Sequence, residues 1–130
     1  MIRPLLIAVA LSAPVAASAQ FVAAPSDSSR VCPDRPAPPG WTVNFNVRDA
    51  DKVILVQQMY RAQSLRAVAE SGDCSCSTRF PSWSDANSYY ATNYAALDRD
   101  GIRQRTSHYS RTANEYRRRA MPICQSQKNW

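Results

Sequence analysis

Two of the chain's four cysteines stand one residue apart in a loop between the two stretches that look most helical. Gly72, just before Cys74 and Cys76, suits the left-handed position that commonly follows a helix. Pro81 and Ser82, just after them, are typical of the start of a new helix. The loop therefore predicts a bend between two helices. A disulfide from Cys74 or Cys76 to another part of the chain would hold that part against the bend.

The first 19 residues have the pattern of a cleavable signal peptide. Arg3 supplies a positive charge, residues 5–11 form an apolar run, and Ala17-Ser18-Ala19 is a small-residue cleavage site. We therefore expect a mature protein that starts at Gln20 and is periplasmic or secreted. An uncleaved membrane anchor is the alternative, although the apolar run is short for a membrane span.

Export places the cysteines in a compartment where disulfides form and persist. An even number of cysteines in a mature chain of 111 residues predicts two bridges within one domain. Each bridge is expected to contribute about 2–4 kcal/mol to stability. The cysteines are Cys32, Cys74, Cys76 and Cys124.

Residues 20–46 predict an extended arm, because prolines are too dense there for a helix. The alternation of apolar and polar residues from Trp41 to Val47 resembles one short half-buried strand. No second strand is available to pair with it. We therefore expect an extended segment that lies over the helices.

The first long helix is expected over about residues 48–71, with Asn46 or Asp49 as its cap. Residues 53–56 are four consecutive apolar residues, which cannot all lie on one helix face. Either this helix is covered on several sides, or that piece is a strand. The good helix formers at residues 57–63 favour the helix.

A second helical region is predicted from about residue 83 to residue 120, ended by Pro122. The stretch from Asp98 to Gly101 is a possible break, since glycine disfavours a helix interior. The fold class is thus all-α: a disulfide-stabilised helical hairpin if the helix is continuous, or a small three-helix bundle if it breaks. The helical domain spans residues 47–124, and residues 125–130 form a C-terminal tail.

Disulfide pairing distinguishes these two arrangements. A break near Gly101 returns Cys124 to the loop, so that two bridges cross-link different elements. A continuous helix leaves Cys124 far from the loop, which favours a Cys32–Cys124 bridge and forces Cys74 to pair with Cys76. A bridge across one intervening residue strains disulfide geometry. We therefore favour the cross-linked bundle.

Positive charge is concentrated in the last quarter of the chain. Residues 20–100 carry eight Lys/Arg and nine Asp/Glu, for a net charge of −1, whereas residues 101–130 carry seven and one, for a net charge of +6. Such a basic end indicates an anionic protein, membrane surface or nucleic acid as partner, or simply a solvated helix face. The residues expected to meet an anionic partner are Arg103, Arg111, Arg117, Arg118 and Arg119.

Tyrosines recur at helical spacing along one broad side of the second helical region. A stripe of this kind predicts core packing or contact with a partner, because aromatic rings supply large apolar area. Its members are Tyr90, Tyr94, Tyr109 and Tyr116.

Little in the sequence indicates catalysis. A thiol-redox protein using Cys74 and Cys76 is the enzymatic alternative, because Arg79 and a helix start could lower a thiol pKa. A nucleic-acid binder is the second alternative, because arginines alternate with Tyr109 and Tyr116. No metal-ligand spacing, cofactor motif or small-molecule substrate is indicated, and the oligomeric state is open.

The order of signal peptide, Pro-rich arm, helical hairpin and paired cysteines resembles the small periplasmic accessory proteins of bacterial type IV secretion and conjugation systems. The resemblance covers the chain in outline, and no functional residue is carried over from it. It implies a non-enzymatic adaptor or assembly role among cell-envelope proteins. In that role the tyrosines would anchor a partner, the arginines would steer it, and the disulfides would keep the docking surface rigid.

Overall fold

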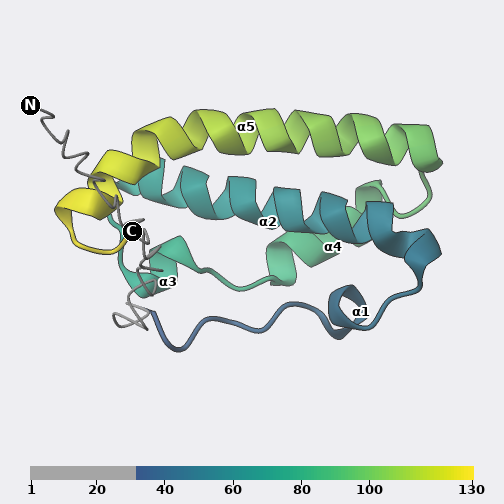
Figure 1. Ribbon diagram of the computed structural model, residues 1–130, viewed down its shortest axis with the longest axis horizontal. Coiled ribbons are helices and arrows are strands. Elements are labelled where there is room, and N and C mark those ends of the chain that lie inside the picture. Colours follow the sequence, from purple (N-terminus) through teal and green to yellow (C-terminus); the bar gives the residue numbers. More distant parts are fainter. Residues whose placement is uncertain (1–31) are drawn as a thin grey trace, which may run out of the picture.

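The computed structural model describes residues 32–130, and the secondary structure over that range is entirely helical. The predicted signal peptide and the first part of the predicted arm lie outside the described residues. The elements, shown in Figure 1, are α1 (Gly40–Val43), a 3-10 helix η1 (Val47–Asp49), α2 (Ala50–Ser71), α3 (Cys76–Arg79), α4 (Ser84–Asn93) and α5 (Arg99–Ser126).

The predicted three-helix bundle is confirmed, with α2 at its centre. The chain returns through α3 and α4, so that α5 runs parallel to α2 and forms the largest interface with it (Figure 1). Asp51 and Arg103 meet near the two N-termini, and Val68 and Ala120 share a core cluster near the other end. Residues 32–39 are extended, lie alongside α3 and α4, and lead into α1.

The four consecutive apolar residues of α2 are explained by its central position. Val53, Leu55 and Val56 are buried, and Ile54 alone is exposed, at 45%. Helix α2 contacts α3, α4, α5 and η1, so it is covered on several sides as the sequence predicts. The helix ends at Gly72, whose φ of 71° is the left-handed conformation that glycine adopts without strain.

The helix break predicted at Asp98–Gly101 is confirmed, but Gly101 lies after it. Helix α4 ends at Asn93, and Asp98 begins α5 by accepting a hydrogen bond from the Gly101 backbone N at 2.8 Å. A Cβ at residue 101 would lie 3.1 Å from the Asp98 carboxylate and 3.3 Å from Leu97 Cβ. Glycine is therefore present because the capping side chain lies close to the first turn.

We expect Asp98→Ala to lower the free energy of unfolding by about 1 kcal/mol, because it removes this N-cap. Asp100→Ala is the matched control: it removes an acid from the first turn of α5 while leaving the cap in place. Urea unfolding followed by circular dichroism measures both. Equal losses for the two variants would show that charge near the helix terminus, rather than the capping hydrogen bond, supplies the stability.

The prediction that Pro122 ends the second helix is wrong, because α5 continues through it to Ser126. Buried Ala120 and Cys124 flank the proline and hold the last turns against α2. The predicted tail is also packed: Asn129 is buried, and the Gln127 side chain accepts from Cys74 N at 2.7 Å and donates to Gly72 O at 2.9 Å. Tertiary contacts thus outweigh the hydrogen bond that proline cannot make.

The predicted arm is extended only as far as Pro39. Residues 40–43 form the helical turn α1 rather than an extended, strand-like segment. The turn is held by tertiary contacts: the Trp41 ring stacks on Tyr90 with centroids 5.4 Å apart, and its indole N donates to Asn87 at 2.9 Å. The Asn46 side chain accepts from Arg48 N and caps η1, which leads into α2.

The disulfides cross-link different elements, as predicted. Cys32 pairs with Cys76, and Cys74 pairs with Cys124. The alternative in which Cys74 pairs with Cys76 is wrong. Both bridges fit an oxidising, exported location. None of the helices within residues 32–130 has the length and apolar character needed to span a membrane.

Candidate functional site

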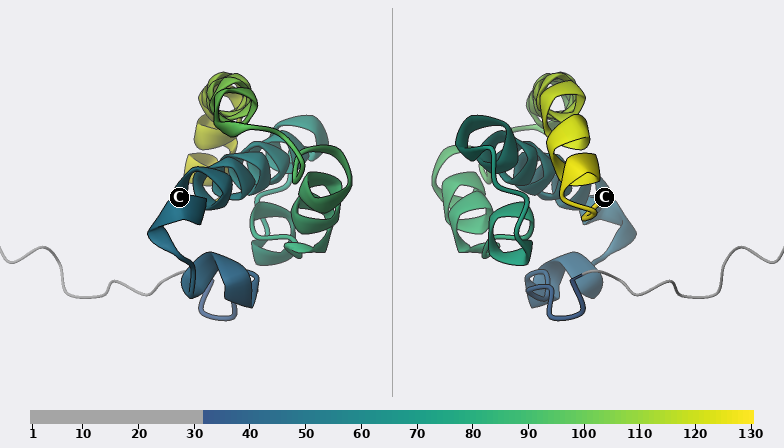
Figure 2. Two further views of the ribbon diagram at one scale, coloured as in Figure 1. Left: turned by 90° about the vertical axis from the view of Figure 1, so that its right-hand side faces the viewer. Right: turned by 90° about the vertical axis from the view of Figure 1, so that its left-hand side faces the viewer.

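The three main helices do not close on one another. Helices α4 and α5 each pack against α2, but contacts between α4 and α5 are few. Figure 2 shows the two helices on different sides of α2. Helix α4 is only 10 residues long, against 28 in α5, so much of α5 has no third helix beside it.

An open groove of about 390 Å³ lies between these helices, with α2 as its floor and α4 and α5 as its walls. We call it the tyrosine groove, because three tyrosines line it. Its lining residues are Met59, Ala62, Gln63 and Arg66 from α2, Asp85, Ala86 and Tyr89 from α4, and His108, Tyr109, Thr112 and Tyr116 from α5.

The predicted tyrosines separate into core and groove. Tyr90 is a core residue, 7% exposed, and packs with Leu55 and Ile102. Tyr109 and Tyr116 line the groove. Tyr94 is half-buried beside it, with its hydroxyl 3.2 Å from that of Tyr109. The stripe seen in the sequence therefore combines a structural residue with residues that can meet a partner.

The Tyr94–Tyr109 pair holds the wall of the groove in place. Their rings meet edge to face with centroids 6.1 Å apart. Burial, and next the hydrogen bond with Tyr94, raise the pKa of Tyr109 well above its ordinary value. Tyr109 therefore stays neutral across the physiological range, and its hydroxyl remains a hydrogen-bonding group rather than a charge.

Sequence reasoning missed Tyr89, which is 51% exposed and lines the groove from α4. It lies next to core residue Tyr90 and therefore outside the stripe that the helical spacing picks out. Its ring contacts Tyr94 edge to face at 5.6 Å. The signal available was the Tyr89-Tyr90 pair itself, because adjacent residues on a helix point about 100° apart and cannot both face the core.

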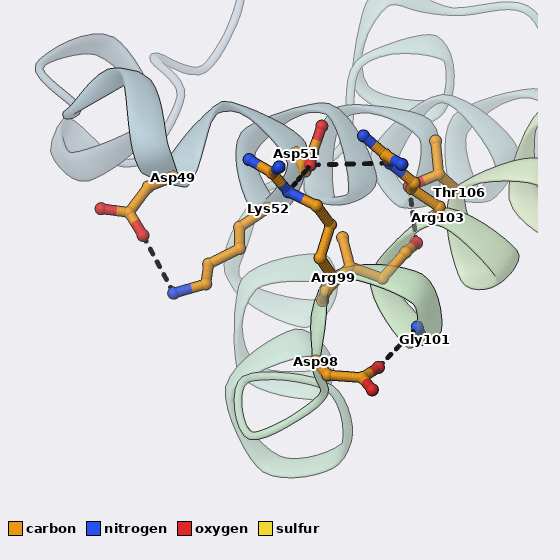
Figure 3. Close-up of polar contacts among 9 residues, drawn as sticks. Asp49, Asp51, Lys52, Asp98, Arg99, Gly101, Arg103 and Thr106 are labelled. Atoms are coloured by element: carbon orange, nitrogen blue, oxygen red, sulfur yellow. Dashed lines mark hydrogen bonds and ion pairs between the residues drawn. The ribbon is translucent and has the colours of Figure 1, made fainter.

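The predicted arginines do not gather on one face of α5. Arg103 lies 3.8 Å from Asp51 of α2, a carboxylate that Arg99 also contacts at 3.1 Å (Figure 3). Arg117 lies over the Trp130 ring, whereas Arg119 lies over the Tyr116 ring. Arg111 and Arg118 are exposed and, seven residues apart, share the outward face. The arginines and tyrosines that the sequence offers for binding nucleic acid are likewise spread around α5 and do not share one face.

The two walls of the groove differ in charge. On the α5 side, Arg105 lies over Tyr94 at 5.4 Å and Arg119 over Tyr116 at 5.4 Å, so positive charge follows the aromatic rim. On the α4 side stands Asp85, which accepts from Gln63 at 3.4 Å. Among residues 32–130, neither Arg105 nor Arg119 is in an ion pair with a carboxylate.

The Cys-Ser-Cys loop holds both cysteines in separate bridges to different elements. Cys74 is 1% exposed and lies in a core cluster with Val68, Ala120 and Cys124. Cys76 is exposed and ties α3 to Cys32. In this state the structure does not bring the two loop cysteines together as a redox pair. Within residues 32–130, no cluster of three or more His, Cys, Asp or Glu side chains is arranged to hold a metal ion.

Comparison with known proteins gives no family: no protein-family model matches the chain, and neither a curated protein nor a solved structure is significantly similar to it.

Proposed function

We propose that this protein is an exported, non-enzymatic adaptor that binds other cell-envelope proteins through the tyrosine groove. The proposed occupant is an amphipathic helix of the partner that carries acidic residues beside its apolar face. The observation that carries this proposal is the open space between α4 and α5 above the floor formed by α2. Tyrosine rings and positive charge border that space.

A helix is the occupant that the groove fits best. Parallel or antiparallel helices pack at interaxial distances of 8–10 Å, and a helix laid over α2 would complete a four-helix bundle. Met59 and Ala62 offer a shallow apolar floor, which suits the anchor residues of such a helix. Tyr89 and Tyr116 offer large rings on opposite walls, and tyrosine is frequent among interface residues that dominate affinity.

Charge complementarity favours an acidic partner. The arginines that border the aromatic rim of α5 form no ion pair with a described carboxylate. Acidic groups flanking the apolar face of a docked helix would meet Arg105 and Arg119. Such rim charges mainly raise the association rate and set the orientation, so the rate should fall with added salt.

Two further expectations complete the proposal. The predicted signal peptide supports a periplasmic or secreted location, and the paired disulfides agree with export. The outline resemblance to accessory proteins of type IV secretion and conjugation systems directs the search for a partner to the periplasmic subunits of such machines. The role would be assembly or bridging of those subunits.

We expect Tyr89→Ala and Tyr116→Ala each to reduce capture of the partner from cross-linked cell envelopes about tenfold, the loss of one anchor residue of a docking helix. Phe45→Ala is the matched control, because it removes an exposed ring on the α1 side, outside the groove. Quantitative mass spectrometry of the captured subunits is the measurement, and melting curves check that each variant is folded.

A photo-crosslinking amino acid placed at Thr112 identifies the occupant. The cross-linked peptide should come from an acidic amphipathic helix of one envelope protein. Cross-links formed equally well from positions 111 and 118, on the outward face of α5, would contradict the groove as the docking site. Unchanged capture by both tyrosine variants would contradict it independently.

A further inference from the structure

A second cavity lies on the opposite side of α2 from the tyrosine groove. Residues 59, 62, 63 and 66 of α2 line the groove, whereas residues 60, 61, 64 and 65 line this second pocket of about 310 Å³. At 3.6 residues per turn the two sets occupy opposite faces of the helix. Apolar walls come from Tyr60, Leu65, Phe80 and Trp130, which belong to α2, to the residue after α3 and to the C-terminal residue of the chain.

Three guanidinium groups surround these apolar walls. Arg79 and Arg117 both lie over the Trp130 ring, with guanidinium carbons 5.0 and 5.4 Å from its centroid. Arg61 lines the pocket from α2 and is held by Asn114, whose side-chain oxygen accepts from it at 2.7 Å. The pocket therefore combines apolar walls with three positively charged lining residues.

These charges have neutral partners. Arg79 is half-buried and donates to the backbone and side-chain oxygens of Asn129. Across residues 32–130, the ion pairs involve other basic residues, so none of Arg61, Arg79 and Arg117 is matched by a carboxylate. Burial, and next the charge of nearby Arg35, lower the pKa of Arg79 from its ordinary value. A half-buried cation without a counter-ion is costly, and a bound anion would offset that cost.

We propose that this pocket binds a small amphipathic anion, an aryl or acyl carboxylate or phosphate monoester. The apolar body lies against Tyr60, Leu65 and Phe80, and the anionic group lies between Arg79 and Arg117. Guanidinium groups suit such oxyanions because they can donate two parallel hydrogen bonds, and these charge-assisted bonds are strong. The pocket volume falls at the lower end of the range for small-molecule sites, which fits a single ring system or a short chain.

The proposal does not depend on the docking of a helix in the tyrosine groove, since the two sites lie on opposite faces of α2. It assigns a ligand class where the sequence indicates no small-molecule substrate. The pocket could not be predicted from the sequence, because Tyr60, Arg79 and Trp130 stand far apart along the chain and only the fold brings them together.

The test uses 2-naphthoate as the probe and its neutral analogue 2-naphthamide as the matched ligand control, titrated into the disulfide-bonded protein at low salt. We expect the amide to bind about tenfold more weakly, because it cannot form charge-assisted bonds with the arginines. Arg117→Gln should weaken naphthoate binding by a similar factor. Arg118→Gln, which removes an exposed charge from the same helix turn, should not. Arg79→Lys keeps the charge but removes the paired donors, and should also weaken binding.

Calorimetry gives the affinities, and the indole N–H signal of Trp130 in a nitrogen-proton correlation spectrum places the ligand. Equal binding of the acid and the amide, equal losses in the Arg117 and Arg118 variants, or naphthoate binding that leaves the Trp130 signal unmoved would each overturn the proposal. No binding up to about 10 mM, weaker than any affinity in the usual specific range, would overturn it as well. Parallel titrations with 1-naphthyl phosphate and decanoate then decide the head group and the body of the natural ligand class.

Discussion

Replacing Cys74 and Cys124 together by alanine should lower the free energy of unfolding by about 4 kcal/mol, the chain-entropy value for a closed loop of this size. The two cysteines are 50 residues apart, and their bridge joins the loop that follows α2 to the last turns of α5. Both lie in the smaller core cluster and are 1% exposed. The loss should therefore be a large part of the 5–15 kcal/mol typical of a domain.

Urea unfolding of the oxidised variants gives this quantity directly. Replacement of Cys32 and Cys76 by alanine is the matched control, since it removes a bridge of similar span, 44 residues. That bridge holds the largely exposed residues 33–38, so its loss should release the arm and cost less than half as much. Equal destabilisation by the two double variants would mean that the arm is as essential to the folded bundle as the α2–α5 contact.

Leu55→Ala should lower the free energy of unfolding by about 2–5 kcal/mol, because it opens a cavity at the centre of the larger core cluster. Leu55 is fully buried and packs with Met59, Tyr90 and Ile102, which belong to three different helices. The surrounding side chains cannot collapse into the space without moving the helices relative to one another.

Ile54→Ala provides the control at the neighbouring position. Ile54 has the same number of carbon atoms but is 45% exposed, so we expect a loss below about 1 kcal/mol. Thermal and urea unfolding, monitored by circular dichroism, measure both variants. A ratio near one between the two losses would place Leu55 outside the core and would require a different packing of α2 than the one described.

Much of the helical architecture can be predicted because its signals are local. Gly72 marks the end of α2 through its backbone freedom, and the Asp98-to-Gly101 stretch indicates a break because glycine disfavours a helix interior. The cap that Asp98 provides for α5 is seen only in the structure. Residues 53–56 reveal the central position of α2, because an all-round apolar segment needs several neighbours. Each of these inferences depends on a few adjacent residues.

The remaining features depend on contacts between distant residues. Pro122 stays within α5 because flanking residues are locked against α2, and no local rule weighs that packing. Residues 40–43 become helical because Trp41 finds Tyr90 and Asn87. The tyrosine groove itself depends on how α4 and α5 are placed relative to each other on α2, which the sequence of neither helix specifies.

The parallel arrangement of α2 and α5 also governs how the chain folds. Arg61 and Asn114 touch across this interface, and they stand 53 residues apart in the sequence. The interface between α2 and α5 therefore forms only after a long loop has closed. In bundles of consecutive antiparallel helices, the main interfaces join helices that are neighbours in the sequence, so shorter loops have to close. Folding should therefore be slow for a helical protein of this size. A disulfide formed early between Cys74 and Cys124 would hold α2 and α5 close together and so speed the formation of their interface.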